Sequence, residues 1–257
     1  MANFKPQKKT QESVKFIRNV VARAGFSKVI VSLSGGIDST TVVFLATQAL
    51  GKENVLVTIL PYGDLNKEGA DDAKEVVKIV EIPKTNVFEI DIKPAVDMIA
   101  KPAEIPPKTS TPLERSRLGS IMARIRMIIL FDLAKKQKAL VCGTENKSEY
   151  LLGYFTRFGD SASDIEPIKG FYKTQVRELA QYLGVPKKII EKPPTAGLWQ
   201  GQADETELGF SYKEADKILE LLYDKKWSLE KIIGTGYKKE LVEKIKKRVE
   251  ETEFMRK

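Results

Sequence analysis

Hydrophobic residues along this 257-residue chain follow two different spacings, and the changes between them mark predicted helices and strands. Val14, Ile17, Val20 and Val21 recur at helical spacing, which predicts an amphipathic helix over residues 11–24. Short continuous apolar runs predict buried strands over residues 28–33, 55–60, 86–90 and 139–142. Helical patterns cover residues 40–50, 67–81, 113–136, 173–183, 211–223 and 237–250.

The order of these elements predicts the fold class. Helices that alternate with short apolar strands indicate βαβ units and therefore a parallel sheet. We expect an α/β protein with a doubly wound, mostly parallel sheet flanked by helices, followed by a helical C-terminal part. The apolar face of the long helix over 113–136 is predicted to contain Leu118, Ile121, Ile125, Ile128 and Ile129.

Three segments lack strong periodicity and are predicted to be irregular: residues 101–112, 153–171 and 192–209. The first is rich in Pro, Lys and Thr, which is typical of an exposed, mobile loop. Long irregular segments inside a compact domain usually have a functional role. We therefore expect the second and third segments to contribute to a site.

Composition excludes several kinds of chemistry. The chain has no histidine and a single cysteine. Histidine-based triads and imidazole zinc sites are excluded, and one cysteine cannot form a disulfide framework, which favours a reducing cytoplasm. Cys142 lies in an apolar run and is interpreted as a buried small residue instead of a nucleophile. No apolar run has transmembrane length and no signal peptide is recognised, so we expect a cytoplasmic protein without membrane contact.

The most specific motif is Ser34-Gly35-Gly36-Ile37-Asp38-Ser39, between a predicted strand and a predicted helix. Its glycines permit positive φ and leave space for a ligand, while its hydroxyls and the free N–H groups of the helix start suit phosphate. Asp38 would repel a phosphate unless a cation lay between them, so the loop predicts pyrophosphate plus Mg²⁺. It is not a Walker A loop, because no Lys precedes the final Ser. An ordinary strand-to-helix turn is the alternative interpretation.

A second polar segment, Gly143 to Glu149, directly follows the predicted strand 139–142. Ligands of open parallel sheets bind at the carboxyl ends of the strands, so this segment should share an edge with the Ser34 loop. Glu149 would then join Asp38 as an Mg²⁺ ligand, and Thr144 would contact the nucleotide. Capping of a helix by Thr144 and Asn146 is the alternative, and the spacing alone leaves both open.

The Ser34 loop resembles the loop of the ATP pyrophosphatases, and the whole chain resembles the NAD synthetase family almost from end to end. Several independent motifs in family order carry this resemblance. They are Ser34 to Ser39, Ala123 to Met127, Gly143 to Glu149, Leu152 to Asp160, Tyr172 to Leu179, Glu191 to Thr195 and Asp204 to Gly209.

The resemblance implies an adenine nucleotide alpha hydrolase-like fold and a single NAD synthetase domain over residues 1–257, without a glutaminase domain. It implies an ammonia-dependent NAD synthetase in which ATP adenylates the nicotinate carboxylate of deamido-NAD. Ammonia would then displace AMP from the acyl adenylate, giving NAD⁺, AMP and pyrophosphate. A likeness to this family also implies a homodimer.

The resemblance assigns roles to individual positions. Asp38 and Glu149 would hold Mg²⁺, Asp160 and Lys173 would be catalytic, with Asp160 where ammonia enters. A dinucleotide with a nicotinate carboxylate needs cationic partners, and the deamido-NAD contacts implied are Arg124, Arg157 and Asp164. ATP would be bound by Ser32, Leu33, Ser34, Gly35, Gly36, Ile37, Asp38, Ser39, Thr144, Lys173 and Thr195.

The chain departs from the family pattern at four places. Gly119-Ser120 replaces the family's Gly-Asn, Arg157 stands where many members have Lys, and Ser161-Ala162 replaces Gly-Gly. Phe254-Met255 replaces a His-Lys pair that contacts substrate, so that contact is not transferred to this chain.

The net charge of +8 keeps two other functions open. One is tRNA modification by adenylation, supported by the basic stretch Lys238 to Arg248 but opposed by the lack of a Cys pair for sulfur transfer. The other is a nucleic-acid-binding module, because Ile233 to Tyr237 faintly resembles a helix-hairpin-helix. A solvated helix after a Gly turn is the preferred interpretation of that segment, and nucleic acid is the less favoured partner.

Overall fold

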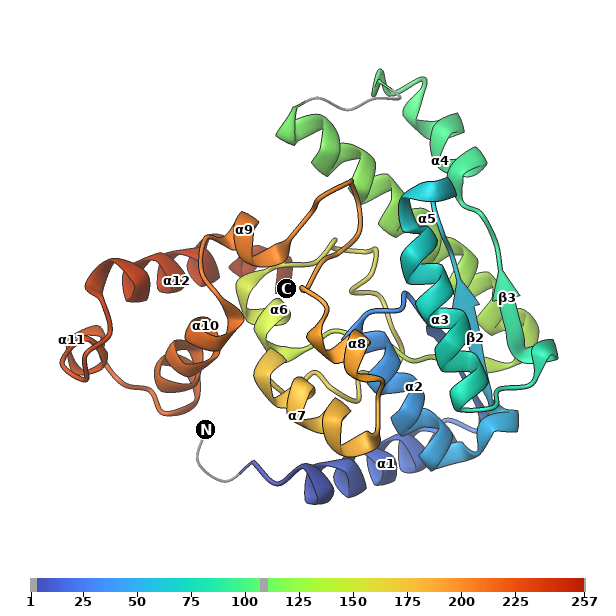
Figure 1. Cartoon of the computed structure of the whole chain (residues 1–257), viewed down its shortest axis with the longest axis horizontal. Coiled ribbons are helices and arrows are strands. Elements are labelled where there is room, and N and C mark those ends of the chain that lie inside the picture. The colour runs from blue at the N-terminus through green and yellow to red at the C-terminus, as the bar shows by residue number, and fades with distance from the viewer. Residues whose placement is uncertain (1–3, 107–110, 257) are drawn as a thin grey trace.

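The computed structural model describes residues 4–106 and 111–256, and its described part contains a parallel sheet of four strands, which lies on the right in Figure 1. The strands are β1 (Lys28–Ser32), β2 (Val55–Ile59), β3 (Val87–Glu89) and β4 (Ala139–Val141), in the order β3-β2-β1-β4. All three strand pairs are parallel, and Val31 of β1 lies opposite Val57 of β2. The predicted parallel sheet is therefore confirmed.

Alternate residues of the strands enter two different cores. Val29 and Val31 belong to a cluster with α1 (Pro6–Arg23), α2 (Ile37–Leu50), α3 (Lys67–Ile79) and α7 (Lys173–Leu183). Ile30 points to the opposite face and packs with Leu130 and Leu133 of α5 (Pro112–Gln137). Helices cover both faces of the sheet, so its strands must be apolar on both sides, as the continuous apolar runs indicate. The predicted doubly wound α/β class is therefore confirmed.

The long helix α5 packs against different partners along its length. Its first half contacts α4 (Lys93–Ala100) in a cluster that includes Leu118 and Met122, and its second half lies on the sheet. Thr111 and Glu114 form a capping box at its N-terminus. The apolar face predicted for this helix was wrong at Ile128, which is 56% exposed. One helical periodicity cannot predict the buried face of the whole helix, because the first half of α5 packs against α4 and the second half against the sheet.

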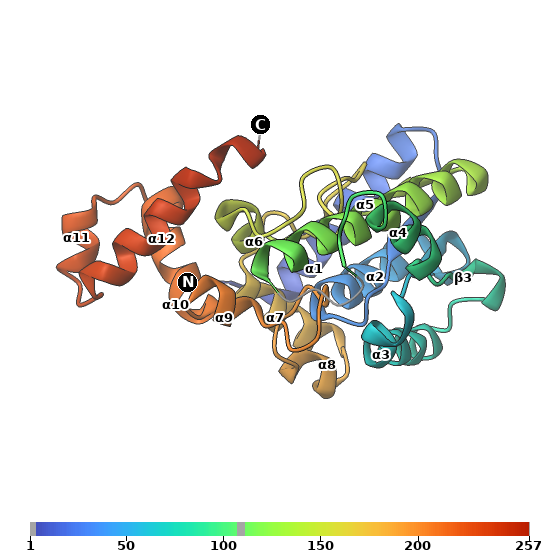
Figure 2. The same ribbon diagram turned by 90° about the horizontal axis from the view of Figure 1, so that it is seen from above.

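The C-terminal part is helical, as predicted. Its helices form a separate apolar cluster and lie to one side of the sheet in both views (Figures 1 and 2). They are α9 (Asp204–Leu208), α10 (Tyr212–Leu219), α11 (Leu229–Ile233) and α12 (Lys239–Glu251), with a π-helical turn over Glu220–Asp224. This helical part contacts the rest of the chain through α6 (Lys147–Leu152) and α7. The cluster includes Leu152 of α6 and, from the helical part, Phe210, Ile218, Leu219, Ile232, Val242 and Ile245.

Short elements account for most remaining differences from the prediction. Helices α4, α8 (Lys187–Glu191), α9 and α11 were not predicted, because five to eight residues are too few to establish a helical period. Residues 154–172 contain no helix or strand apart from one bridge between Ile165 and Cys142, as expected. Of the loop predicted over 101–112, residues 107–110 lie outside the described residues. The 3₁₀ turns are Lys52–Asn54, Gly63–Asn66, Lys84–Asn86 and Glu253–Arg256.

Within the described ranges, no helix combines the length and apolar character that a membrane span requires.

Candidate active site

The sheet topology creates a crevice between the ends of β1 and β4. After β1 the chain enters α2 on one face, whereas β4 is reached from α5 on the opposite face. The strand order runs outward from β1 to β2 and β3 and then returns to β4 on the other side of β1, so it reverses between β1 and β4, which is the usual position of a ligand site in such sheets. A cavity of about 770 Å³ lies there and is lined by the Ser34 loop and by Gly143 to Glu145.

The Ser34 loop is held in shape by its own hydroxyls. The Oγ atoms of Ser34 and Ser39 lie 3.0 Å apart, and the N–H of Ser34 donates to Ser39 Oγ at 3.2 Å. Helix α2 begins at Ile37, and its N-cap residue, Gly36, provides no side-chain hydrogen bond. The first N–H groups of a 14-residue helix thus face the cavity without a side-chain cap, an arrangement that binds phosphate.

Two glycines allow this loop to approach α3 closely. Gly35 has a φ of +77°, and a Cβ there would lie 2.2 Å from the carbonyl oxygen of Gly69. A Cβ on Gly69 would in turn lie 2.7 Å from the carbonyl oxygen of Ser34. Gly35 was found from the motif, but Gly69 was missed, because its role depends on a neighbour 34 residues earlier.

The two predicted metal ligands converge on one lysine. Lys173 Nζ lies 2.5 Å from Asp38 Oδ2 and 2.8 Å from Glu149 Oε1. The remaining Asp38 oxygen accepts a 2.9 Å hydrogen bond from Asn146 Nδ2, and Asn146 Oδ1 caps the N–H of Glu149 at 3.0 Å. Asn146 therefore does cap α6, as the alternative interpretation held, and its side chain also contacts the Asp38 carboxylate.

Burial shapes the electrostatics of this group. Desolvation raises the pKa of Glu149 above its usual value, against the lowering effect of Lys173. Burial alone would lower the pKa of Lys173, but Asp38 and Glu149 outweigh it and hold that pKa above its usual value. Lys173 is only 3% exposed, so its ammonium is enclosed by protein, whereas the carboxylates of Asp38 and Glu149 stay partly open to the cavity. The ion pair stabilises a charge that would otherwise be costly to bury.

The donor set fits Mg²⁺. Mg²⁺ is usually held by one or two carboxylates, with waters and substrate phosphates completing its octahedron. Asp38 and Glu149 are two carboxylates whose oxygens already reach a common cation, the Lys173 ammonium. The described residues contain no cluster of three or more metal-binding side chains. Phosphate oxygens would therefore have to supply part of the coordination, which links the metal to the nucleotide.

Residues 192–203 lie across the cavity. Lys192 pairs with Asp72 on α3 at 3.0 Å, and Asn66 Nδ2 donates to the carbonyl of Gly197 at 2.6 Å. Leu198 packs on α5 at Gly119, where a Cβ would lie 2.9 Å from Leu198 Cδ1. Thr195 is in this segment and lines the cavity, as do Thr144 and the predicted Ser32 to Ser39.

Asp160 and Arg126 line another side of the cavity. Asp160 Oδ1 accepts the N–H of Thr156 at 2.7 Å; the residue as a whole is exposed, yet protein atoms packed around its carboxyl raise its pKa. Arg126 donates to the Leu60 carbonyl and to Asn66 Oδ1, both at 3.0 Å, and desolvation lowers its pKa to about 10, so it stays charged at neutral pH. Arg126 was missed, although it stands two residues after the predicted Arg124.

The three residues predicted to bind deamido-NAD are not among those that line the cavity. Arg124 is exposed and donates to the carbonyl of Arg157 at 3.2 Å, so these two lie together. The carboxylate of Asp164 accepts the N–H of Val141 at 2.7 Å, which ties its loop to β4. Their assignment to the substrate stays a prediction.

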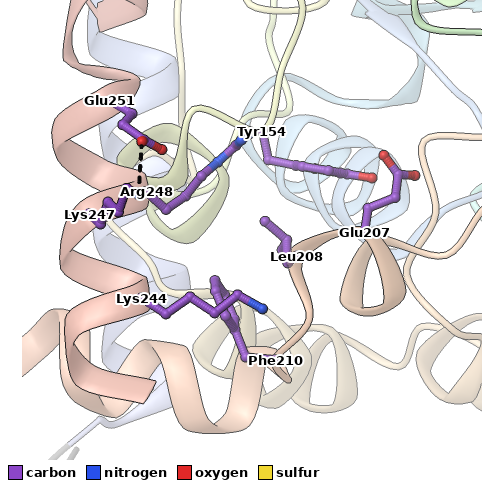
Figure 3. Close-up of a pocket in the computed structure, with 8 residues that line it drawn as sticks. All are labelled: Tyr154, Glu207, Leu208, Phe210, Lys244, Lys247, Arg248 and Glu251. Carbon is purple, nitrogen blue, oxygen red and sulfur yellow. Dashed lines mark ion pairs between the residues drawn. The ribbon is translucent and has the colours of Figure 1, made fainter. Parts of the chain in front are cut away.

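A smaller cavity of about 340 Å³ lies between α12 and the chain around α9 (Figure 3). Its basic residues are engaged by the protein itself: Lys244 Nζ donates to the Gly209 carbonyl at 3.2 Å, and Arg248 Nε to the Leu152 carbonyl at 2.9 Å. Tyr154 lines both cavities. We interpret the smaller cavity as a packing feature of the helical part.

Cys142 is buried beside the sheet, as predicted, and burial raises the pKa of its thiol. A neutral, buried thiol is a poor nucleophile. The chemistry of the cavity therefore depends on oxygen and nitrogen groups.

Comparison with known proteins agrees with this geometry. The profile of the family described as NAD synthase matches residues 9–257. The NH(3)-dependent NAD(+) synthetase of Fusobacterium nucleatum is 44% identical over 245 residues, which cover 95% of this chain and 91% of the relative. The enzyme of the same name from Pyrococcus furiosus is 46% identical over 229 residues, covering 89% and 85%.

Two solved structures are also similar over nearly their whole length. The NH3-dependent NAD synthetase from Campylobacter jejuni, in complex with the nitrate ion, has a TM-score of 0.81 and 32% identity, covering 99% of this chain and 97% of that one. The structure of NMN synthetase from Francisella tularensis has a TM-score of 0.83 and 32% identity, with the same coverage of 99% and 97%.

Proposed function

Since the chain belongs to the NAD synthase family, we propose that it makes NAD⁺ from deamido-NAD, ATP and ammonia through an acyl adenylate. The family assignment itself makes the protein a ligase of the NH3-dependent NAD synthetases, which use ATP. The identity of the acid substrate, the adenylate, Mg²⁺ and the residue roles are the proposal.

The proposed reaction has two steps. A nicotinate carboxylate oxygen attacks the α-phosphorus of ATP, the bond to the bridging oxygen of the β-phosphate breaks, and pyrophosphate leaves. Ammonia then attacks the acyl carbon, the bond to AMP breaks, and a proton is released as the amide forms. No step needs a protein nucleophile, so a site without histidine and with a buried thiol is sufficient. The protein contributes orientation and preorganised charge.

The observation that carries the proposal is the convergence of Asp38, Glu149 and Lys173 beside the Ser34 loop in one cavity. The uncapped start of α2 would bind the phosphates, with Thr144 and Thr195 also on the nucleotide. Asp38 and Glu149 would hold Mg²⁺, which when bound neutralises charge on the leaving pyrophosphate. Lys173 would contact ATP and support the departing phosphates.

Asp160 would meet ammonia, because its carboxyl lies on the cavity wall beside the fixed cation Arg126. Arg124, Arg157 and Asp164 would contact deamido-NAD outside the single-chain cavity. We further propose that residues 1–257 act as one catalytic domain in the cytoplasm and assemble as a homodimer. The large exposed side chains of Ile128, at 56%, and Phe158, at 63%, support a second copy covering this side of the molecule. Sedimentation of the purified protein tests the dimer.

The decisive experiment incubates purified protein with ATP, Mg²⁺, deamido-NAD and an ammonium salt, and follows NAD⁺, AMP and pyrophosphate. Equal amounts of the three products support the proposal, whereas ADP and phosphate would contradict the adenylate. Nicotinate mononucleotide should be tested in parallel, because the Francisella tularensis structure is named an NMN synthetase. A clear preference for the mononucleotide would replace deamido-NAD as the substrate. Efficient use of glutamine, with ammonia removed, would contradict the nitrogen source.

A further inference from the structure

The N-terminus of α7 is supported by side chains from two other helices. Lys173 is the first residue of α7, and its N–H donates to Ser148 Oγ of α6 at 2.8 Å. The next N–H, from Thr174, donates to Asp216 Oδ2 of α10 at 2.8 Å. Ser148 Oγ donates in turn to Asp216 Oδ1 at 2.5 Å. Asp216 therefore fixes the first turn of α7 directly and through Ser148.

Asp216 is placed where an aspartate is costly. It is fully buried on α10, whose neighbouring positions Ala215, Ile218 and Leu219 belong to the apolar cluster of the helical part. A buried carboxylate is tolerated only when its oxygens are well bonded, and both Asp216 oxygens accept hydrogen bonds. Its negative charge at the start of α7 also offsets the unfavourable placement of Lys173 at that end of the helix dipole.

The same helix contacts the other end of the lysine. Tyr212 lies one turn before Asp216, and its ring centre is 5.3 Å from Lys173 Nζ. The Tyr212 hydroxyl donates to Asp204 Oδ2 at 3.3 Å, and Asp204 lines the cavity. Helix α10 thus holds both the backbone and the ammonium of Lys173.

We propose that Asp216 is a positioning residue for the NAD synthetase reaction, and that it sets the place of the Lys173 ammonium through Ser148 and the first turn of α7. This inference rests on the proposed contact of Lys173 with ATP. It gives the C-terminal helical part a share in nucleotide binding, although most of the cavity wall comes from the α/β part.

A double-mutant cycle tests the inference. Asp216→Asn keeps the volume but removes the charge and one acceptor, and Lys173→Met removes the ammonium. With full-length protein, Asp216→Asn should raise the KM for ATP by about ten- to a hundredfold, the range for one charge-assisted contact. The KM for deamido-NAD should change by less than about threefold, because the change is local to the nucleotide end. In the Lys173→Met background, Asp216→Asn should cause almost no further loss.

Additive losses in the two backgrounds, or equal increases in both KM values, would show that Asp216 is only a structural cap and would overturn the inference. Parent-like kinetics of Asp216→Asn together with an impaired Lys173→Met would also overturn it, while leaving the proposed function intact. Parent-like kinetics of Lys173→Met would instead overturn the proposed role of the lysine.

Two further variants protect the test against misfolding. Ser148→Ala removes the link to the Lys173 N–H but leaves Asp216 on Thr174, so it should raise the KM for ATP by a smaller factor and should also be silent in the Lys173→Met background. Ser13→Ala is the matched control, because its buried hydroxyl donates to the Pro167 carbonyl at 3.3 Å and does not line the cavity. Ser13→Ala should leave both KM values unchanged. If Asp216→Asn does not fold, Ser148→Ala takes its place in the cycle. Equal losses from Ser148→Ala in the parent and in the Lys173→Met background would then overturn the inference.

Discussion

The α/β part and the C-terminal helical part use buried charge in different ways. In the α/β part, charged side chains such as Asp38, Glu149 and Arg126 line the cavity. In the helical part the interior is an apolar cluster, and its buried carboxylates, Asp204 and Asp216, lie on the side that meets the cavity and α7. The difference indicates a division of labour in which the α/β part offers most of the groups that line the cavity, and the helical part, apart from Asp204, holds such groups in place.

The largest expected effect comes from the proposed metal ligands. Asp38→Ala and Glu149→Ala should each lower the rate of pyrophosphate release at least about a hundredfold, since each removes charge aimed at the reacting phosphates. Asp97→Ala is the control, because that carboxylate pairs with Lys93 and lies outside the cavity lining. Full pyrophosphate release by Asp38→Ala, with a normal melting temperature, would show that this carboxylate has no role in the reaction. It would thereby contradict the proposed division between the two parts.

The next effect tests the close approach of the loop to α3. Gly35→Ala combines a positive φ with a Cβ 2.2 Å from the Gly69 carbonyl, so the loop must move and activity should fall about a hundredfold. Gly170→Ala is the control, because a Cβ there meets nothing within 4 Å and its φ is not positive. Steady-state kinetics with ATP as the varied substrate measure the effect. Equal kinetics of the two variants would mean that the loop geometry is not needed.

A smaller effect is expected at the predicted substrate arginines. Arg124→Ala and Arg157→Ala should raise the KM for deamido-NAD by about ten- to a hundredfold, the value of one charge-assisted contact, and change the KM for ATP much less. Arg157→Lys should be milder, because charge survives while the planar fork is lost. Arg18→Ala serves as control, since Arg18 donates to the Ala49 carbonyl at 3.1 Å away from the cavity. If both alanine variants keep the parent's KM for deamido-NAD, the dinucleotide binds at another part of the molecule.

The smallest effect concerns pH and the buried acids of the α/β part. Burial raises the pKa of Glu166 from 4.5 to about 7, so the folded state prefers the protonated form and loses stability as pH rises between these values. Glu166→Gln removes this penalty. The free energy of unfolding of the variant, relative to that of the parent, should therefore be about 1–3 kcal/mol larger at pH 8 than at pH 4. Denaturant titrations of parent and variant at both pH values measure the difference. If the difference in unfolding free energy between variant and parent is the same at both pH values, the prediction is wrong.

Local sequence was sufficient to predict a candidate site whose residues lie in one contiguous segment. The strand, the Ser34 loop and the start of α2 follow one another without interruption, so the Ser34 loop could be recognised as a candidate site, and it does line the cavity. The fold class followed from apolar strands that are buried on both faces. The buried face of α5 was only partly predictable, because it depends on which element lies beside each turn.

Long-range support could not be predicted in the same way. Ser148 and Asp216 are 68 residues apart, and Thr174 and Asp216 are 42 apart, so no local pattern connects them. One signal was present: Asp216 is a charged residue on the apolar side of an amphipathic helix. Such a residue needs a partner, but the sequence does not identify the partner. Arg126 carried no comparable signal beside Arg124.

The alternation of the strands between two cores has a consequence for how the sheet register is encoded. Both faces are apolar, so polarity cannot distinguish them, but over residues 29–31 and 55–57 the side chains on the two faces differ in volume. Valines 29, 31, 55 and 57 face α2, whereas Ile30 and Leu56 face α5. Exchanging Val29 and Ile30 would keep composition and hydropathy identical, yet would overfill one core and leave a void in the other. In the central part of β1 and β2, the order of valine and the larger aliphatic residues therefore helps to determine which face each residue occupies.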